Sequence, residues 1–274
     1  MAADRCTSPA PRDGFVALVG AGPGDPELLT LKAARHLARA DVVLVDALVN
    51  PAVLSHCRPG VRVVPVGKLG GGPQTPQALI HAHIEREARA GHYVVRLKGG
   101  DPFLFGRGGE EALFCEARGI GWEVVPGVSS ALAVPAAAGI PVTHRGVATH
   151  VTVISGTVLA DAEAHEARWT CLARAGGTLV FLMALGRLDA VRARLLAAGL
   201  APDTPAAALQ DGTLPTARAV YAPLSELPEA VAAAALGSPA LVVVGDVVGV
   251  AAELGVPAAV AGLAAAPPAR AAGM

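Results

Sequence analysis

Short runs rich in β-branched residues alternate with helix-like stretches along most of the chain, and this alternation constrains the fold more than any other feature. Each run is bounded by Gly, Pro or Asp, as strands commonly are. In the first half the runs lie at 15–19, 42–45, 61–66, 93–97 and 122–125. Strands that alternate with helices predict a mainly parallel sheet with helices on both faces.

Two of the intervening helices carry end signals. Asp25 is expected to N-cap the first, with Pro26 at its first helical position. Thr75 is expected to cap the second, with Pro76 at its first helical position and Gly91 at its end. The signals therefore predict one helix between the first two strands and another before the fourth.

The alternation resumes after a Gly/Pro-marked passage at 136–146. Strand patterns at 150–154, 178–183 and 240–244 and a helix pattern at 187–199 define this second half. The run at 216–224 predicts an antiparallel strand, so the second sheet is expected to be mixed. We predict an N-terminal α/β domain over 15–144 and a C-terminal α/β domain over 145–256. A disordered arm (1–14) and a disordered tail (257–274) are expected to flank them.

Composition limits the classes of partner. The formal net charge of -1, from 22 basic and 23 acidic residues, does not favour nucleic acid or an anionic membrane. The four cysteines form no CxxC pair, which argues against a zinc or disulfide framework and predicts no bound metal. Apolar runs end before the roughly 18 residues of a membrane span, and the start lacks the apolar core of a signal peptide. We expect a cytoplasmic protein.

The loop "VGAGPGD" at 19–25 resembles a dinucleotide-binding loop but departs from it. The third glycine comes one residue early for G-x-G-x-x-G. Pro23 removes an N–H donor, and Asp25 adds an anion where a pyrophosphate needs positive potential. Asp46, after the second strand, keeps the dinucleotide interpretation open, because a ribose-binding acid is expected there. A tight turn that binds nothing is the other alternative.

A second glycine-rich stretch, "RLKGGDPFLFGRGGEEA" at 96–112, follows the fourth strand. Gly99 and Gly100 allow a ligand to approach the backbone closely, and Asp101 offers a carboxylate suited to hydroxyls or a cation. Loops at the carboxyl ends of parallel strands gather at one edge of the sheet. The unusual residues after strands one, two and four are therefore predicted to share a crevice.

Four motifs together point to a family. "VGAGPGDPELLTLKA", "VVRLKGGDPFLFGRGGEEA", "VPG" (125–127) and "GIPVTHR" (139–145) occur in the order and spacing of the uroporphyrinogen-III C-methyltransferases. The chain resembles this branch of the tetrapyrrole methylases from about residue 15 to 256. The resemblance implies a homodimer whose two α/β domains hold S-adenosylmethionine in the cleft between them. It also implies methylation of uroporphyrinogen III at C2 and C7, through precorrin-1 to precorrin-2, for siroheme or cobalamin biosynthesis.

The resemblance also assigns roles by position. It implies Asp46 as proton acceptor and Lys68 as proton donor. The implied cofactor contacts are Pro23, Gly99, Gly100, Asp101, Leu104, Ser129, Ser130, Met183, Ala208, Gly212 and Ala240. Relatives commonly have threonine and alanine where this chain has the two serines, and many have a Gly-His pair where it has Thr157.

The tetrapyrrole substrate carries eight carboxylates, so the site needs local positive charge. Arg107, His144 and Arg145 are the candidates, with Arg96 and Lys98 as weaker ones because strand alternation could turn one of them outward. Some relatives carry fused dehydrogenase and ferrochelatase or synthase domains, and this chain is expected to stop at precorrin-2. The alternatives are a methylase of a later corrin intermediate and a non-catalytic module that binds the cofactor.

Overall fold

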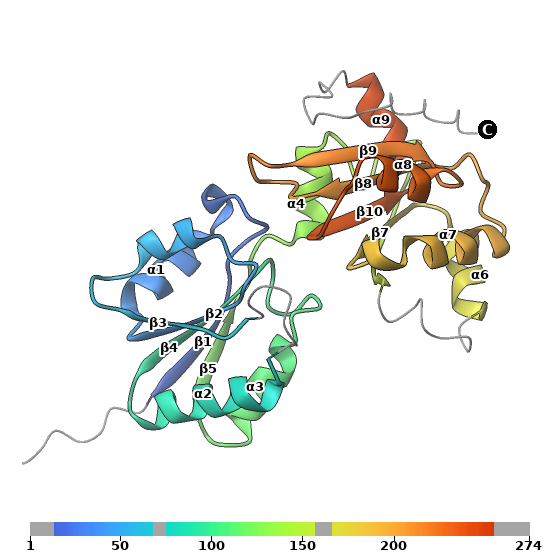
Figure 1. The fold of residues 1–274 in the computed structure, drawn as a ribbon. Coiled ribbons are helices and arrows are strands. Elements are labelled where there is room, and N and C mark those ends of the chain that lie inside the picture. The colour runs from blue at the N-terminus through green and yellow to red at the C-terminus, as the bar shows by residue number, and fades with distance from the viewer. Residues whose placement is uncertain (1–13, 68–74, 157–165, 255–274) are drawn as a thin grey trace, which may run out of the picture. The chain divides into compact units, whose positions relative to one another are not determined.

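The computed structural model describes residues 14–67, 75–156 and 166–254, which divide into two compact units between Val128 and Ser129 (Figure 1). Most of the predicted arm, the predicted tail, Lys68 and Thr157 lie outside the described residues. In the described ranges, no helix is both long enough and apolar enough to cross a membrane.

The first unit is built on a parallel five-stranded sheet in the order β3-β2-β4-β1-β5. Its strands are β1 (Phe15–Gly20), β2 (Val42–Val45), β3 (Arg62–Pro65), β4 (Tyr93–Lys98) and β5 (Gly121–Val125). Its helices are the 3-10 turns η1 (Pro26–Leu28) and η2 (Pro51–His56) and the α-helices α1 (Leu31–Arg39), α2 (Gln77–Arg89) and α3 (Gly108–Glu116). All five predicted strands are confirmed to within one residue at each end.

Helices cover both faces of this sheet, as predicted (Figure 1). Successive side chains of a strand point to opposite faces. On β4, Val95 and Leu97 belong to the core under α1, whereas Val94 belongs to the core under α2 and α3. Arg96 and Lys98 alternate in step with Val94, so both side chains lie on the side of α2 and α3.

The first predicted helix begins later than expected. The Asp25 carboxylate accepts from the Glu27 N–H at 2.9 Å, but it caps only the 3-10 turn η1. The chain is extended again at Leu29, and α1 begins after Thr30, whose Oγ1 accepts from the Ala33 N–H at 3.1 Å. The second helix begins one residue late, because Pro76 is its N-cap and not its first helical residue.

The second unit has a mixed five-stranded sheet in the order β6-β7-β10-β8-β9, in which only β6 and β7 are parallel. Its strands are β6 (Val151–Ser155), β7 (Thr178–Leu182), β8 (Pro205–Gln210), β9 (Arg218–Pro223) and β10 (Ala240–Val244). Its helices are α4 (Ser130–Ala137), α6 (Glu166–Ala175), η4 (Leu185–Arg187), α7 (Leu188–Ala197), α8 (Leu227–Ala233) and α9 (Val247–Glu253). The mixed sheet is confirmed, but β8 was missed because its run of alanines carries no β-branched signal.

The boundary between the units lies earlier than predicted. The residues of helix α4 were assigned to the first domain, but the helix packs within the second unit. A Cβ on Gly212 would lie 2.2 Å from Val134 of α4, and the Tyr221 hydroxyl donates to the Ala138 carbonyl at 3.1 Å. The Gly/Pro-marked passage at 136–146 therefore follows this helix inside the second unit and does not separate the two.

Candidate active site

The loops that follow β1 and β4 are joined through their glycines. Gly22 and Gly100 form an antiparallel bridge, in which the Gly22 N–H donates to the Gly100 carbonyl at 3.3 Å and the Gly100 N–H donates back at 2.7 Å. Both glycines have left-handed φ values, 81° and 65°, that other residues rarely adopt. The predicted grouping of these two loops is confirmed.

Gly20, Gly127 and the Gly100 carbonyl approach each other closely. A Cβ at Gly20 would lie 2.6 Å from that carbonyl oxygen, and a Cβ at Gly127 would lie 2.2 Å from it. Asp101 fixes the arrangement, since its carboxylate accepts from the N–H groups of Gly127 at 3.1 Å and Phe103 at 2.8 Å. A carboxylate among these loops disfavours a bound pyrophosphate, which argues against the dinucleotide interpretation.

The segment that follows β2 joins the same group. The Asn50 side chain donates to the Gly24 carbonyl at 2.8 Å, so it ties this segment to the loop that holds Pro23. Leu48 lies beside Gly99, and its side chain is exposed. The structure therefore brings the loop that holds Pro23 together with Gly99, Gly100 and Asp101, and Leu104 lies three residues after Asp101 in the same loop.

Asp46 lies at the carboxyl end of β2, where its N–H donates to the Leu97 carbonyl at 3.0 Å. Its Oδ1 accepts from Arg96 Nη2 at 2.5 Å, and its Oδ2 lies 4.0 Å from Lys98 Nζ. The Asp46 side chain is 29% exposed, so a ligand can reach it. Lys68, its predicted partner in proton transfer, lies outside the described residues, and its role stays a prediction.

Arg96 and Lys98 are not the substrate-binding cations that the sequence suggested as weaker candidates. Their side chains are 2% and 3% exposed and lie on one face of β4, not on opposite faces. Both contact Glu111 of α3, whose side chain is fully buried. Burial lowers the pKa of Lys98, and the charge of Arg96 lowers it further, whereas Glu111 and Asp46 oppose the shift.

Glu111 was not recognised as a site residue from the sequence. The sequence contains one indication of such a residue. Arg96 and Lys98 lie in an otherwise apolar strand, and buried cations need a buried anion. The partner could not be chosen from the sequence, since Glu110 and Glu111 are adjacent and only α3 packing decides which one turns inward. Glu110 is exposed and pairs with Arg107.

Arg107, a predicted substrate-binding residue, is exposed but already has a partner. Its Nε and Nη2 donate to the two Glu110 oxygens at 2.8 and 2.7 Å, and this hydrogen bonding raises the pKa of Arg107. Both Arg107 and Phe105 have left-handed φ values, 59° and 53°, which is strained for residues with a Cβ. The other two candidates, His144 and Arg145, are exposed on the second unit.

Three of the predicted cofactor residues of the second unit lie at one end of its sheet. Met183 follows β7, Gly212 follows β8 and Ala240 begins β10, which is antiparallel to both. Met183 is half exposed and has a left-handed φ of 59°. Strained backbone of this kind clusters at ligand-binding sites, so Met183 stays a candidate cofactor contact.

The remaining predicted cofactor residues of this unit differ in availability. Ser129 Oγ accepts from the Ala131 N–H at 3.2 Å as the N-cap of α4, and Ser130 is the first residue of that helix. Their backbone groups remain candidates. Ala208 lies in the middle of β8, fully buried in the core, which argues against a direct cofactor contact there.

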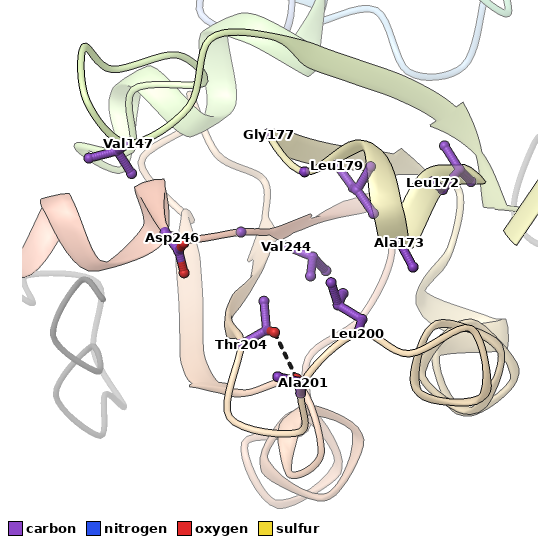
Figure 2. Close-up of a pocket in the computed structure, with 12 residues that line it drawn as sticks. Val147, Leu172, Ala173, Gly177, Leu179, Leu200, Ala201, Thr204, Val244 and Asp246 are labelled. Carbon is purple, nitrogen blue, oxygen red and sulfur yellow. Dashed lines mark hydrogen bonds between the residues drawn. The ribbon is translucent and has the colours of Figure 1, made fainter. Parts of the chain in front are cut away.

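A separate pocket lies at the opposite end of the second sheet (Figure 2). Its lining residues include Gly177 and Thr204, which directly precede β7 and β8, and Val244, the last residue of β10. Its volume is about 150 Å³, below the roughly 300–1,000 Å³ of pockets that hold drug-sized ligands. Burial raises the pKa of Asp246, the charged residue on its wall. This pocket is not the predicted cofactor site.

Residues 16–228 match the family model of the Tetrapyrrole (Corrin/Porphyrin) Methylases. The chain belongs to the tetrapyrrole methylase family. A uroporphyrinogen-III C-methyltransferase from Pseudomonas aeruginosa is 50% identical over 234 residues, which cover 85% of this chain and 94% of that protein. The chain is also 45% identical to a siroheme synthase from Edwardsiella ictaluri, of which it spans 52%.

Solved structures of the tetrapyrrole methylase family support the two-unit α/β fold. A uroporphyrin-III C-methyltransferase from Thermus thermophilus in complex with S-adenosyl homocysteine has a TM-score of 0.72 and 44% identity, over 86% of this chain and 93% of that chain. A cobalt precorrin-4 methyltransferase has a TM-score of 0.74 but 27% identity, over 85% of this chain and 95% of that one. The fold therefore remains similar in a methyltransferase whose sequence identity to this chain is only 27%.

Proposed function

We propose that this tetrapyrrole methylase is a uroporphyrinogen-III C-methyltransferase. It transfers methyl groups from S-adenosylmethionine to C2 and C7 of uroporphyrinogen III and gives precorrin-2 through precorrin-1, for siroheme or cobalamin biosynthesis. The observation that carries the proposal is the 50% identity to the Pseudomonas aeruginosa relative along nearly its whole length. The enzyme works as a homodimer in the cytoplasm.

The glycine loops of the first unit fit S-adenosylmethionine. Gly22 and Gly100 expose backbone at left-handed φ values, and Asp101 supplies a carboxylate suited to ligand hydroxyl or ammonium groups. From the second unit, Met183, Gly212 and Ala240 would complete the contacts. When bound, the cofactor supplies the methyl group as a sulfonium, and this chemistry needs orientation and exclusion of water more than a strong acid.

Asp46 is the proton acceptor of the proposed reaction. The pyrrole carbon that attacks the methyl group belongs to an electron-rich ring system, which must lose a proton as it rearranges, and a nearby carboxylate accelerates such a transfer. Asp46 is partly exposed at the carboxyl edge of the sheet, and Arg96 holds one of its oxygens. Lys68, in the chain that follows β3, is the proposed proton donor.

Exposed cations recognise the carboxylates of the substrate. Arg107 is one of them, and a substrate carboxylate would compete with Glu110 for its bidentate guanidinium face. His144 and Arg145 supply positive charge from the second unit. Although the protein is nearly neutral overall, these residues would create a local positive potential that attracts the polyanionic substrate.

The decisive experiment incubates the pure protein anaerobically with uroporphyrinogen III and S-adenosylmethionine and follows product mass. We expect a dimethylated product. Asp46→Asn should lower kcat about 100-fold or more, while the Kd for S-adenosyl homocysteine changes little, because the substitution removes a proton acceptor and no cofactor contact. Asp189→Asn, an exposed change on α7, is the matched control and should leave kcat unchanged.

Each result separates one alternative. No mass gain would overturn the proposed reaction, and tight cofactor binding without turnover would instead favour the non-catalytic module. Preferential methylation of a later corrin intermediate in competition would favour the sister methylase. Equal losses of kcat and cofactor affinity in Asp46→Asn would show that Asp46 is structural.

A further inference from the structure

Asp46, Arg96, Lys98 and Glu111 form a charged cluster. Only the Asp46 side chain is partly exposed, and the other three side chains are buried. Glu111 Oε1 accepts from Arg96 Nε and from Lys98 Nζ, both at 3.1 Å, and Oε2 accepts from Lys98 Nζ at 3.0 Å. Burying charges in this way is costly, and apolar side chains of similar volume are often at least as stabilising. The cluster therefore calls for an explanation other than stability.

The Arg96 guanidinium is held on every side. Nη1 donates to the carbonyl oxygens of Leu44 and Leu97 at 3.3 Å each, and Nε donates to Glu111. These bonds fix the plane of the group and leave Nη2 aimed at Asp46. Because a guanidinium is planar and rigid, fixing one edge fixes the other.

The formal charges of the cluster also balance, with two cations and two carboxylates. Without Glu111, Asp46 would be the single anion of the cluster facing both Arg96 and Lys98. Lys98 Nζ is already 4.0 Å from Asp46 Oδ2, and it would lose the anion that holds it on its other side. The Asp46 carboxylate would then be drawn toward the cations and out of its orientation.

We propose that Glu111 is a positioning residue, which acts through Arg96 and Lys98 to hold the Asp46 carboxylate in the orientation that accepts a proton. The inference rests on the proposed role of Asp46. Glu111 reaches the Asp46 carboxylate through Arg96 and Lys98, and its remaining hydrogen bond, from Gln77 Nε2 at 3.2 Å, comes from α2.

The test compares Glu111→Gln, Asp46→Asn and the double variant with the wild-type enzyme. Glu111→Gln should lower kcat roughly 100-fold, the scale of a misplaced catalytic group, and leave the Kd for S-adenosyl homocysteine unchanged. The double variant should be no slower than Asp46→Asn alone, because both changes remove the same function. A merely structural role would lower kcat in addition to the Asp46→Asn loss.

Glu87→Gln is the matched control. Glu87 is a second buried carboxylate of the same unit, with a side chain 3% exposed, and its partners Arg62, Arg86 and His92 are outside the cluster. This variant should be destabilised but should keep wild-type kcat at a temperature where it is folded. If Glu111→Gln does not fold, Arg96→Lys keeps the charge and removes the bridging fork, and it should show the same kcat loss and the same non-additivity with Asp46→Asn.

The outcomes distinguish this inference from the function on which it rests. Wild-type turnover in Asp46→Asn would overturn the role of Asp46 and this inference with it. A slow Asp46→Asn combined with a fast Glu111→Gln, or losses that multiply in the double variant, would overturn the positioning role alone. A kcat loss in Glu87→Gln equal to that in Glu111→Gln would also overturn it.

Discussion

Glu87 and Glu111, two buried carboxylates of the first unit, differ in the partners that they bind. Glu87 of α2 accepts hydrogen bonds from Arg86 at 2.8 Å and His92 at 3.0 Å and pairs with Arg62. These partners are half exposed and tie the surface of the unit to its interior. Glu111 has buried partners that lead to a candidate catalytic group. The difference lies in what surrounds each carboxylate.

Glu87→Gln should lower the free energy of unfolding by about 1 kcal/mol at neutral pH, because the substitution removes charged hydrogen bonds whose cationic partners are half exposed and screened by water. Burial by itself would raise the pKa of Glu87, but the hydrogen bonds from Arg86 and His92 and the charge of Arg62 outweigh it and leave the pKa below its usual value of 4.5. A lowered pKa stabilises the folded state above the unfolded-state pKa, and the contribution is lost as pH falls through the folded-state pKa.

The difference between wild type and Glu87→Gln should therefore be constant near neutral pH and shrink as pH falls below about 4.5. Urea unfolding at a series of pH values measures it. A difference that grows toward acid pH would contradict this assignment of the ion pairs.

At the scale of elements, the start of α1 shows two capping signals in succession. Asp25 and Thr30 both accept from backbone N–H groups, but only Thr30 begins an α-helix that buries Leu37 against the sheet. The 3-10 turn η1 lies between them, and its last residue, Leu28, packs against Gly22 of the glycine loop. The sequence pattern predicted correctly that Asp25 is an N-cap, but Asp25 caps η1 and not the α-helix that follows.

Thr30→Ala should reduce the free energy of unfolding by about 1 kcal/mol, because the N–H of Ala33 loses its acceptor at the helix start. Thr30→Ser keeps the hydroxyl and should retain most of the stability. Chemical denaturation of the two variants side by side measures the effect. Equal stability of Thr30→Ala and wild type would show that this cap is replaced by water at no cost.

At the scale of the whole molecule, each unit has hydrophobic cores of its own. The two cores of the first unit lie on opposite faces of its parallel sheet, and the core of the second lies under α6, α7 and α8. Cofactor contacts, by contrast, are predicted from both units. We therefore expect each unit to fold without the other, whereas cofactor binding should require both units.

A fragment of residues 14–128 should accordingly unfold cooperatively in urea, since it contains both faces of its sheet and the helices that cover them. Circular dichroism measures the transition, and calorimetry with S-adenosyl homocysteine should detect no binding to the fragment. The full chain is the control for binding. A gradual, non-cooperative transition would show that the first unit depends on the second.

The sequence by itself determined the strands of the first unit, the need for glycine in two loops, and Asp46 as the group at the end of β2. These features follow from local patterns, since β-branched runs, turn residues and motif spacing act over a few neighbouring residues. It also favoured the tetrapyrrole methylase family, because four motifs in order are far more specific than any one of them.

Only the tertiary structure decided the sheet order, which places β4 between β1 and β2 and so brings the three loops together. It also decided that α4 belongs to the second unit, and that Glu111 rather than Glu110 faces Arg96 and Lys98. Each of these depends on contacts between elements far apart in the chain, where burial and packing outweigh local preference. The charged residues of β4 look like surface cations in the sequence, and only their burial beside Glu111 connects them to Asp46.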